Sequence, residues 1–275
     1  MAQRKAGRTV VAEPLTPTLL ARLGALDSLP ETPPDFDPAR SWVNKYLIFT
    51  CHGYVESGNQ GIGVLRLERE PEERGAGFLF RVRQRIVHDT GHVHEIEVLA
   101  RCHADRLATP IEWRLLSRIE DPGGRELRGL QSEDRGSFDA GKIVVKRGSA
   151  ERVRPWKGPL TSDWGLMEAV QRLDPGADNS GLFSLLQGFA VMRSGQEIVA
   201  VRQERVGEVV GGPLLRVTQI GRGVLPYDYW LLPGPRRLAI LTTGARAYIL
   251  DERADEAVNR RLRAIRARNR RRRHD

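Results

Sequence analysis

The stretch that decides the fold is "GFLFRVRQRIVHDTGHVHEIEVLARCHA", residues 77–104. Apolar residues alternate with polar or charged ones on both sides of Thr90-Gly91-His92. This alternation, with a period of two, is typical of β-strands that bury one face. A three-residue loop that contains glycine is a common connection between antiparallel strands. The stretch therefore predicts a long β-hairpin whose apolar face packs on a core.

The two faces also predict a register for this hairpin. Placing Asp89 opposite Val93 pairs apolar residues with apolar ones, for example Ile86 with Ile96. A slip by one residue would mix the two faces, which a half-buried sheet does not tolerate. The same register pairs Val82 with Ala100, Phe80 with Cys102 and, on the polar face, Arg85 with Glu97.

The rest of the chain between its two ends has the same texture. Turn signals such as "DPGG" (121–124) and "DAGK" (139–142) separate alternating runs, at about the spacing of an all-β sandwich or barrel. One helix interrupts, predicted over 162–173 with a polar N-cap and a Pro-Gly stop. Strands resume with 181–192, followed by an expected turn at 194–196. No alternation of strands and helices is visible, which argues against a parallel sheet.

We therefore divide the chain into three parts. Residues 1–41 form a Pro-rich N-terminal extension in which leucines at spacings of 4, 4 and 3 predict a short docked helix. Residues 42–251 form an antiparallel β domain that includes the helix 162–173. Residues 252–275 form a basic C-terminal helix and tail. The predicted fold class is mainly β (α+β).

The C-terminal end carries nearly all of the net charge. The whole chain has 44 basic and 35 acidic residues, a formal charge of +9. Residues 258–275 hold nine arginines and one aspartate, so the remaining 257 residues have a charge of only +1. The composition therefore excludes a basic nucleic-acid-binding body, although a basic end alone can attract phosphates.

The basic end is predicted to be a helix, because Ala254, Val258, Leu262 and Ile265 recur at helical spacing with acids first and arginines last. Three interpretations of its arginines stay open: a solvated end, a contact with an anionic membrane surface or acidic partner, and a contact with nucleic acid. Aromatic residues are absent after Tyr248, so no platform for base stacking exists there. The candidate anion-binding residues are Arg260, Arg261, Arg263, Arg266, Arg268, Arg270, Arg271, Arg272 and Arg273.

Metal binding and catalysis have few candidates in the sequence. His88, His92 and His94 lie near the hairpin turn and are the only metal candidates, but no Cys-x-x-Cys or His-Glu-x-x-His spacing accompanies them. The alternative is a hairpin tip with half-buried or solvated histidines. The chain has no Gly-x-Ser-x-Gly elbow, and Cys51 and Cys102 form no disulfide framework. We expect no cofactor and favour a protein that is not an enzyme.

The stretches "GPLTSDWGLMEAVQRL" (158–173) and "VLPYDYWLLPGPRRLAILTTGARAYILDE" (224–252) carry a resemblance in layout. Over about 42–251, the order of elements resembles the bacterial lipoprotein-carrier (LolA-like) proteins. The resemblance implies a long antiparallel meander curved as a half-barrel around the central helix, with an apolar, lipid-like ligand on its concave face. The ligand-facing residues would be Phe80, Val82, Ile86, Ile96 and Val98.

The sequence thus predicts a non-enzymatic β-rich binding or scaffold protein for an apolar small molecule or lipid. The alternative is a protein tethered to nucleic acid or an anionic surface by its Arg-rich end. The ligand-facing residues could also simply pack on the helix and leave no cavity. No transmembrane segment or secretory h-region is visible, so we expect a cytoplasmic protein; an envelope location would require a start other than Met1.

Overall fold

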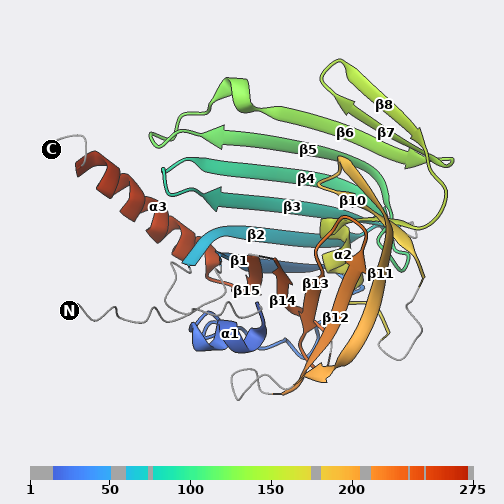
Figure 1. Ribbon diagram of the computed structural model, residues 1–275, viewed down its shortest axis with the longest axis horizontal. Coiled ribbons are helices and arrows are strands. Elements are labelled where there is room, and N and C mark those ends of the chain that lie inside the picture. The colour runs from blue at the N-terminus through green and yellow to red at the C-terminus, as the bar shows by residue number, and fades with distance from the viewer. Residues whose placement is uncertain are drawn as a thin grey trace, which may run out of the picture.

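The computed structural model describes residues 15–50, 60–73, 77–174, 181–204, 212–234, 236–244 and 246–271. This part of the chain forms one sheet of fifteen strands, shown in Figure 1. The strand order is β8-β7-β6-β5-β4-β3-β2-β1-β15-β14-β13-β12-β11-β10-β9. The strands at the two ends of this order, β8 and β9, do not pair with each other, so the sheet is not closed. The prediction of a mainly β fold is confirmed.

The first half of the sheet is a meander in which each strand pairs antiparallel with the next. Its strands are β1 (Trp42–Thr50), β2 (Gln60–Pro71), β3 (Gly77–Val87), β4 (Val93–His103), β5 (Pro110–Glu120), β6 (Ser132–Asp139), β7 (Lys142–Arg147) and β8 (Ala150–Pro155), with a short 3-10 helix, η1 (Arg128–Leu130), before β6.

The second half joins the first through β15, which pairs with β1. Its strands are β9 (Leu160–Ser162), β10 (Phe183–Gln187), β11 (Val191–Glu204), β12 (Leu214–Gly221), β13 (Tyr227–Leu231), β14 (Leu238–Thr243) and β15 (Arg246–Leu250). All its pairings are antiparallel except that of β9 with β10. The helix α2 (Asp163–Ala169) connects these two parallel strands, so the sheet contains one strand–helix–strand unit that the sequence pattern did not reveal.

The hairpin of β3 and β4 spans the stretch that predicted the fold, but its register differs from the prediction. Val87 pairs with Val93, so the register that placed Asp89 opposite Val93 is wrong by two residues. A slip by two keeps every side chain on its own face, and the alternation therefore cannot detect it. The connection comprises residues 88–92 and is longer than the expected loop. In the observed register Phe78 pairs with Cys102, Phe80 with Ala100, Val82 with Val98 and Arg83 with Glu97.

Two further expectations need correction. The expected single strand 181–192 is divided by a turn after Gln187, where Gly188 and Phe189 both have positive φ. The expected turn at 194–196 lies inside β11. Gly195, with φ +67°, lies where the β10–β11 register shifts, so the chain forms a bulge there and does not reverse direction. The predicted helix 162–173 is α-helical over Asp163–Ala169 and continues as turns to Arg172.

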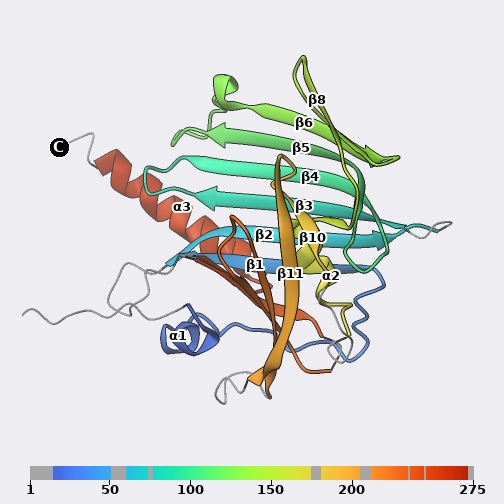
Figure 2. The ribbon, with the colours of Figure 1, turned by 45° about the vertical axis from the view of Figure 1, so that its right-hand side comes forward.

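The sheet curls so that its two halves face each other with α2 between them, as the two views in Figures 1 and 2 show. Inner-face side chains of both halves and the buried side of α2 form the main core. A buried ion pair holds α2 to the first half: Arg69 Nε lies 2.8 Å from Glu168 Oε1, and neither side chain is more than 3 % exposed. Arg172 pairs with the same carboxylate.

The other two described α-helices also pack against the sheet. The short helix α1 (Pro17–Arg22), capped by Thr16, places Leu19 and Leu20 in the main core. The predicted C-terminal helix is confirmed as α3 (Ala254–Arg271). Val258 and Ile265 of α3 pack in a second, smaller core on the outer face of the sheet. Neither α3 nor any other described helix is long and apolar enough to span a bilayer.

Candidate ligand groove

The five residues predicted to face a ligand lie on the inner face of β3 and β4. Phe80, Val82, Ile86 and Val98 are buried, and Ile96 is half-buried against the same core. Phe80 contacts Trp42 edge to face, with 6.4 Å between ring centroids. None of the five lines the groove described next. All five pack in the main core.

The histidines of the β3–β4 hairpin have protein partners. His92 Nδ1 lies 2.8 Å from Thr90 Oγ1, and His94 Nε2 lies 2.9 Å from Ser117 Oγ. Burial, then the nearby charges of His88 and Arg246, lower the pKa of His94. Within the described residues, no group of three or more His, Cys, Asp or Glu side chains is placed to hold a metal ion. Cys51 lies outside the described residues, and Cys102 is a buried thiol whose pKa is raised by burial.

A groove of about 290 Å³ lies where the two ends of the sheet approach each other. We call it the inter-edge groove. One wall comes from β7 and β8, and the other from β10, β11 and the turn between them. Its lining is Ile143, Val145, Arg147, Ala150, Arg152 and Arg154 on the first wall, and Leu186, Ala190, Val191 and Met192 on the second.

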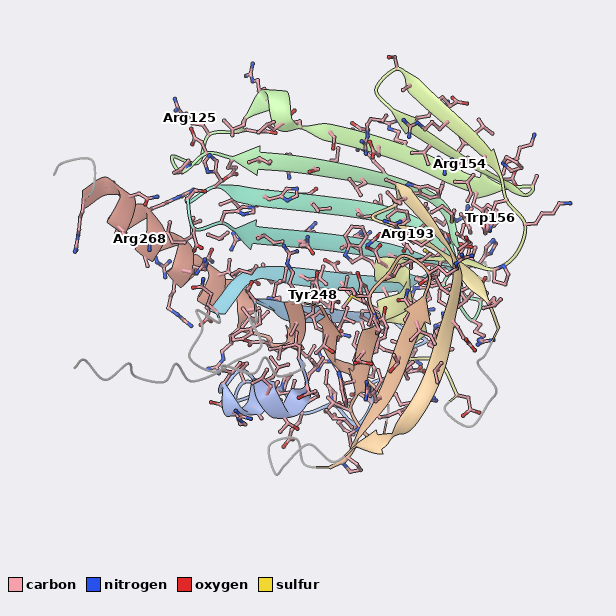
Figure 3. The ribbon with its side chains drawn as sticks, in the orientation of Figure 1. Arg125, Arg154, Trp156, Arg193, Tyr248 and Arg268 are labelled. Atoms are coloured by element: carbon pink, nitrogen blue, oxygen red, sulfur yellow. The ribbon has the colours of Figure 1, made fainter. Side chains whose placement is uncertain are left out.

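Strand pairing brings the three arginines to one face. Arg152 pairs with Val145 and Arg154 pairs with Ile143 across the β7–β8 ladder, so each cation lies beside an apolar residue of the groove floor. Ile143 is buried, whereas every residue of β8 is exposed. The first wall therefore presents hydrocarbon at its base and guanidinium groups along its exposed edge, and Figure 3 labels Arg154 at this end of the molecule.

The arginines of the groove differ in their charge partners. Arg147 forms a two-point ion pair with Asp134, a carboxylate whose side chain is only 2 % exposed. Within the described part of the chain, Arg152 and Arg154 have neither an ion-pair partner nor a side-chain hydrogen bond. Two cations at the groove edge are thus left for an anion that the groove could receive.

The second wall is held rigidly by aromatic stacking. Phe189 adopts φ +54°, a conformation rare for residues with a side chain. Its ring lies between Trp113, at 5.1 Å, and Trp164 of α2, at 6.0 Å between centroids. These contacts fix the turn that carries Ala190 into the groove. The positive φ follows from tertiary packing, and local sequence preference gave no sign of it.

Asp163 at the start of α2 holds the same turn through hydrogen bonds. Both carboxylate oxygens lie 3.2 Å from the backbone nitrogen of Gly188, which donates to them. Burial raises the pKa of Asp163 to about 6, against the lowering effect of the backbone donors. The residue as a whole is half-buried.

The arginines of the basic end are mostly placed on an ordered helix and do not form a free tail. Arg261 donates to Gln60 and Asp89, and Arg268 donates to the backbone oxygen of Asp89. Arg260, Arg263, Arg270 and Arg271 are exposed, and Arg266 is half-buried. Arg272 and Arg273 lie outside the described residues.

Sequence reasoning missed the groove arginines. The signal was present in "AERVRP" (150–155), where alternate arginines share one face of a short strand. The pattern cannot show that Leu186 and Met192, far along the chain, lie opposite them. Only the strand order of the curled sheet brings the two walls together.

Comparisons with known proteins find a likeness only among solved structures. No protein-family model and no curated protein sequence matches the chain. Three solved chains do match. One is described as the beta-barrel-like protein of domain of unknown function DUF1849 from Brucella abortus; it is 14 % identical, has a TM-score of 0.49, and the match covers 76 % of this chain and 94 % of that one. A likeness at this level says nothing about a ligand or an activity.

Proposed function

We propose that the protein is a non-enzymatic binding protein that holds an anionic amphiphile, an acyl chain with a carboxylate or phosphate head, in the inter-edge groove. The observation that carries the proposal is an apolar floor beside two guanidinium groups, those of Arg152 and Arg154, that have no partner among the described residues. The resemblance in layout to lipoprotein carriers, inferred from the sequence, agrees with the proposal, but the groove is lined by residues other than those which that resemblance implied.

The chemistry of the lining favours binding over catalysis. The ten lining residues include no Ser, Cys, His, Asp or Glu, so they provide neither a nucleophile nor an acid–base pair. Hydrocarbon from Val145, Leu186 and Met192 can bury a chain, and guanidinium groups can bind an oxyanion in two-point geometry. These are the two properties that an amphiphile requires.

The size of the groove limits how much of the ligand it can bury. Its volume of about 290 Å³ is near the lower limit of ordinary ligand pockets. Burial of about six methylenes would contribute roughly 5 kcal/mol, at about 0.8 kcal/mol for each. A charge-assisted hydrogen bond from each free arginine would add roughly 1.5–3 kcal/mol. The ligand that fits best therefore has a short buried segment and a head at β8.

The test is displacement of a fluorescent fatty-acid probe by decanoate and by decanol, its uncharged counterpart. Decanoate should bind more tightly than decanol. Arg152→Gln and Arg154→Gln should each weaken decanoate binding by about ten-fold or more and leave decanol unchanged. Arg83→Gln is the matched control, because Arg83 is exposed on the outer face of β3 and its loss changes the net charge equally.

A second variant tests the apolar part of the site. Ala150 lines the groove from the exposed strand β8, so Ala150→Trp should fill the groove and abolish binding of both ligands without unfolding the protein. Unchanged decanoate affinity in Ala150→Trp and in both arginine variants would overturn the proposal, because the ligand would then bind elsewhere.

A further inference from the structure

A second candidate site lies at the other end of the molecule, on the outside of the sheet. The C-terminal half of α3 crosses the ends of the β3–β4 and β5–β6 connections, at the left of Figure 1. A cleft of about 430 Å³ separates α3 from the β5–β6 turn. We call it the helix–turn cleft, and its lining is Asp121, Pro122, Gly123, Arg125, Arg266, Asn269 and Arg270.

The position of α3 beside this cleft is well defined. Asn269 Nδ2 donates to the backbone oxygen of Thr90 at 3.0 Å, and Ile265 is buried against the sheet. Gly91, with φ +88°, lets the hairpin approach the helix: a Cβ there would lie 3.3 Å from the Asn269 amide and 3.4 Å from Ile265. The arginines that follow on the helix are therefore held against the turn.

Asp121, the acidic residue of the cleft, already bonds to other residues of the β5–β6 turn. Asp121 Oδ1 accepts the backbone N–H groups of Gly123 and Arg125, and Oδ2 lies 3.0 Å from Arg125 Nη2. These hydrogen bonds, that from the Arg125 backbone first, lower the pKa of Asp121. The carboxylate thus remains charged but is already fully engaged.

The two helix arginines of the cleft have no charge partner in the part of the chain that the structure describes. Within the described residues, neither Arg266 nor Arg270 forms an ion pair or a side-chain hydrogen bond. The Nε of Arg266 is moreover buried and has no hydrogen-bond acceptor. A buried donor without an acceptor destabilises the structure. The guanidinium reaches Gly124, so it lies at the turn.

We propose that the helix–turn cleft binds a phosphate-type oxyanion between Arg266 and Arg270. A tetrahedral oxyanion matches the fork of a guanidinium group and would accept from the terminal nitrogens of both arginines. The cleft is also large enough for such a group, and Asp121 does not compete with it for the two arginines. This site is independent of the inter-edge groove, because it shares no residue with it.

Two observations favour a discrete phosphate group over a polymer or an inserted helix. Among the described residues that line the cleft, none has an aromatic ring on which a nucleic-acid base could stack. The apolar stripe of α3 is already buried against Val64, Val87 and Val93 of the sheet, so the helix has no free apolar face to insert into a membrane. Recognition is therefore by hydrogen bonds to one group.

The test is titration of the full chain with inorganic phosphate, followed by calorimetry and by the shift in melting temperature. We expect saturable binding with one site. Arg266→Gln and Arg270→Gln should each weaken it by about ten-fold or more. Arg263→Gln is the matched control: it removes the same charge from an exposed position of the same helix that does not line the cleft, and it should change affinity less than about two-fold.

The outcomes separate a built site from diffuse attraction. Equal loss in all three variants, or the absence of saturable binding, would overturn the proposal. Competition by phosphatidate vesicles that depends on Arg266 and Arg270 would identify a lipid headgroup as the source of the phosphate. Competition only by soluble phosphate monoesters would identify a small molecule. Ala150→Trp should leave phosphate binding unchanged, so this site and the groove can fail separately.

Discussion

Two arginines on the inner face of the same sheet differ completely in their surroundings. Arg69 on β2 is buried, pairs with Glu168 and stacks over the ring of Phe78 at 4.4 Å. Arg154 on β8 is exposed and has no charge partner in the described part of the chain. The inner face is therefore filled at one end, around α2, and hollow at the other, between the sheet edges.

The difference shows how one open sheet can combine a stable core with a site for a ligand. At the filled end, the buried Arg69 requires a counter-charge, because an unpaired buried charge would lower the free energy of unfolding of the protein by several kcal/mol. Glu168 provides that charge and also ties α2 to β2. At the hollow end, water solvates Arg154, so no partner is needed for stability. A group that is not required for folding remains available to a ligand.

The largest expected effect is at the filled end. Glu168→Ala would leave Arg69 and Arg172 without their shared carboxylate and should lower the free energy of unfolding by about 3–5 kcal/mol, measured by urea denaturation. Glu151→Ala is the matched control, because its ion pair with Lys146 is exposed and should contribute less than about 1 kcal/mol. Similar losses in the two variants would mean that the buried pair does not anchor α2.

A smaller loss is expected where the filled end meets the groove. Gly136 on β6 lies beneath Trp113, and a Cβ there would lie 2.1 Å from the ring. Gly136→Ala should therefore displace the ring from Phe189 and destabilise the protein by about 1–3 kcal/mol, seen as a lower melting temperature. Gly129→Ala, where a Cβ would have no neighbour within 4 Å, should change it little. An unshifted melting temperature in Gly136→Ala would show that the Trp113–Phe189 stack is loose.

The sequence predicted the elements of this molecule better than their tertiary relations. Alternation identified the β3–β4 hairpin and the meander because it reports which face of a strand is buried. It could not distinguish the observed register from one shifted by two residues, since both bury the same side chains. Helical spacing identified α3 for the same reason. The pattern shows that Val258 and Ile265 lie on a buried face, but it does not show which residues they pack against.

The candidate sites could not be predicted because they depend on contacts between distant segments. The two walls of the groove meet only through the order of strands in the sheet. The turn at Phe189 is held by two tryptophans from other elements, against the local preference of a non-glycine residue. The sequence shows the arginines of α3 only as a charged run. Which of the described ones have partners, such as Arg261, and which have none, such as Arg270, depends on where the helix packs.

Asp163, which joins α2 to the turn between β10 and β11, should make the free energy of unfolding depend on pH. Burial raises the pKa of Asp163 to about 6, so between pH 4 and 6 the folded state binds more protons than the unfolded state. The contribution of Asp163 to the free energy of unfolding is fully present below the pKa that the group has in the unfolded chain, and it is lost as pH rises through about 6. Asp163→Asn should remove that loss, which is at most about 3 kcal/mol for two pKa units.

Urea denaturation of both proteins from pH 4 to 7 checks this prediction. The wild type should lose stability relative to Asp163→Asn as pH rises, and the difference should become constant above about pH 7. The Asn side chain still offers an oxygen to the N–H of Gly188, so the turn should remain in place. A difference that did not change with pH would place the carboxylate of Asp163 in contact with bulk water.

The smallest effect belongs to the arginine at the hollow end. Arg154→Leu removes a cation that has no partner in the described structure, so the free energy of unfolding should change by less than about 0.5 kcal/mol. The same variant should lose decanoate binding, since Leu adds hydrocarbon but no donor. Loss of binding without loss of stability is the signature of a residue kept for a ligand. A loss of more than about 1 kcal/mol would instead mean that Arg154 stabilises the free sheet edge, and the contrast with Arg69 would then be one of degree only.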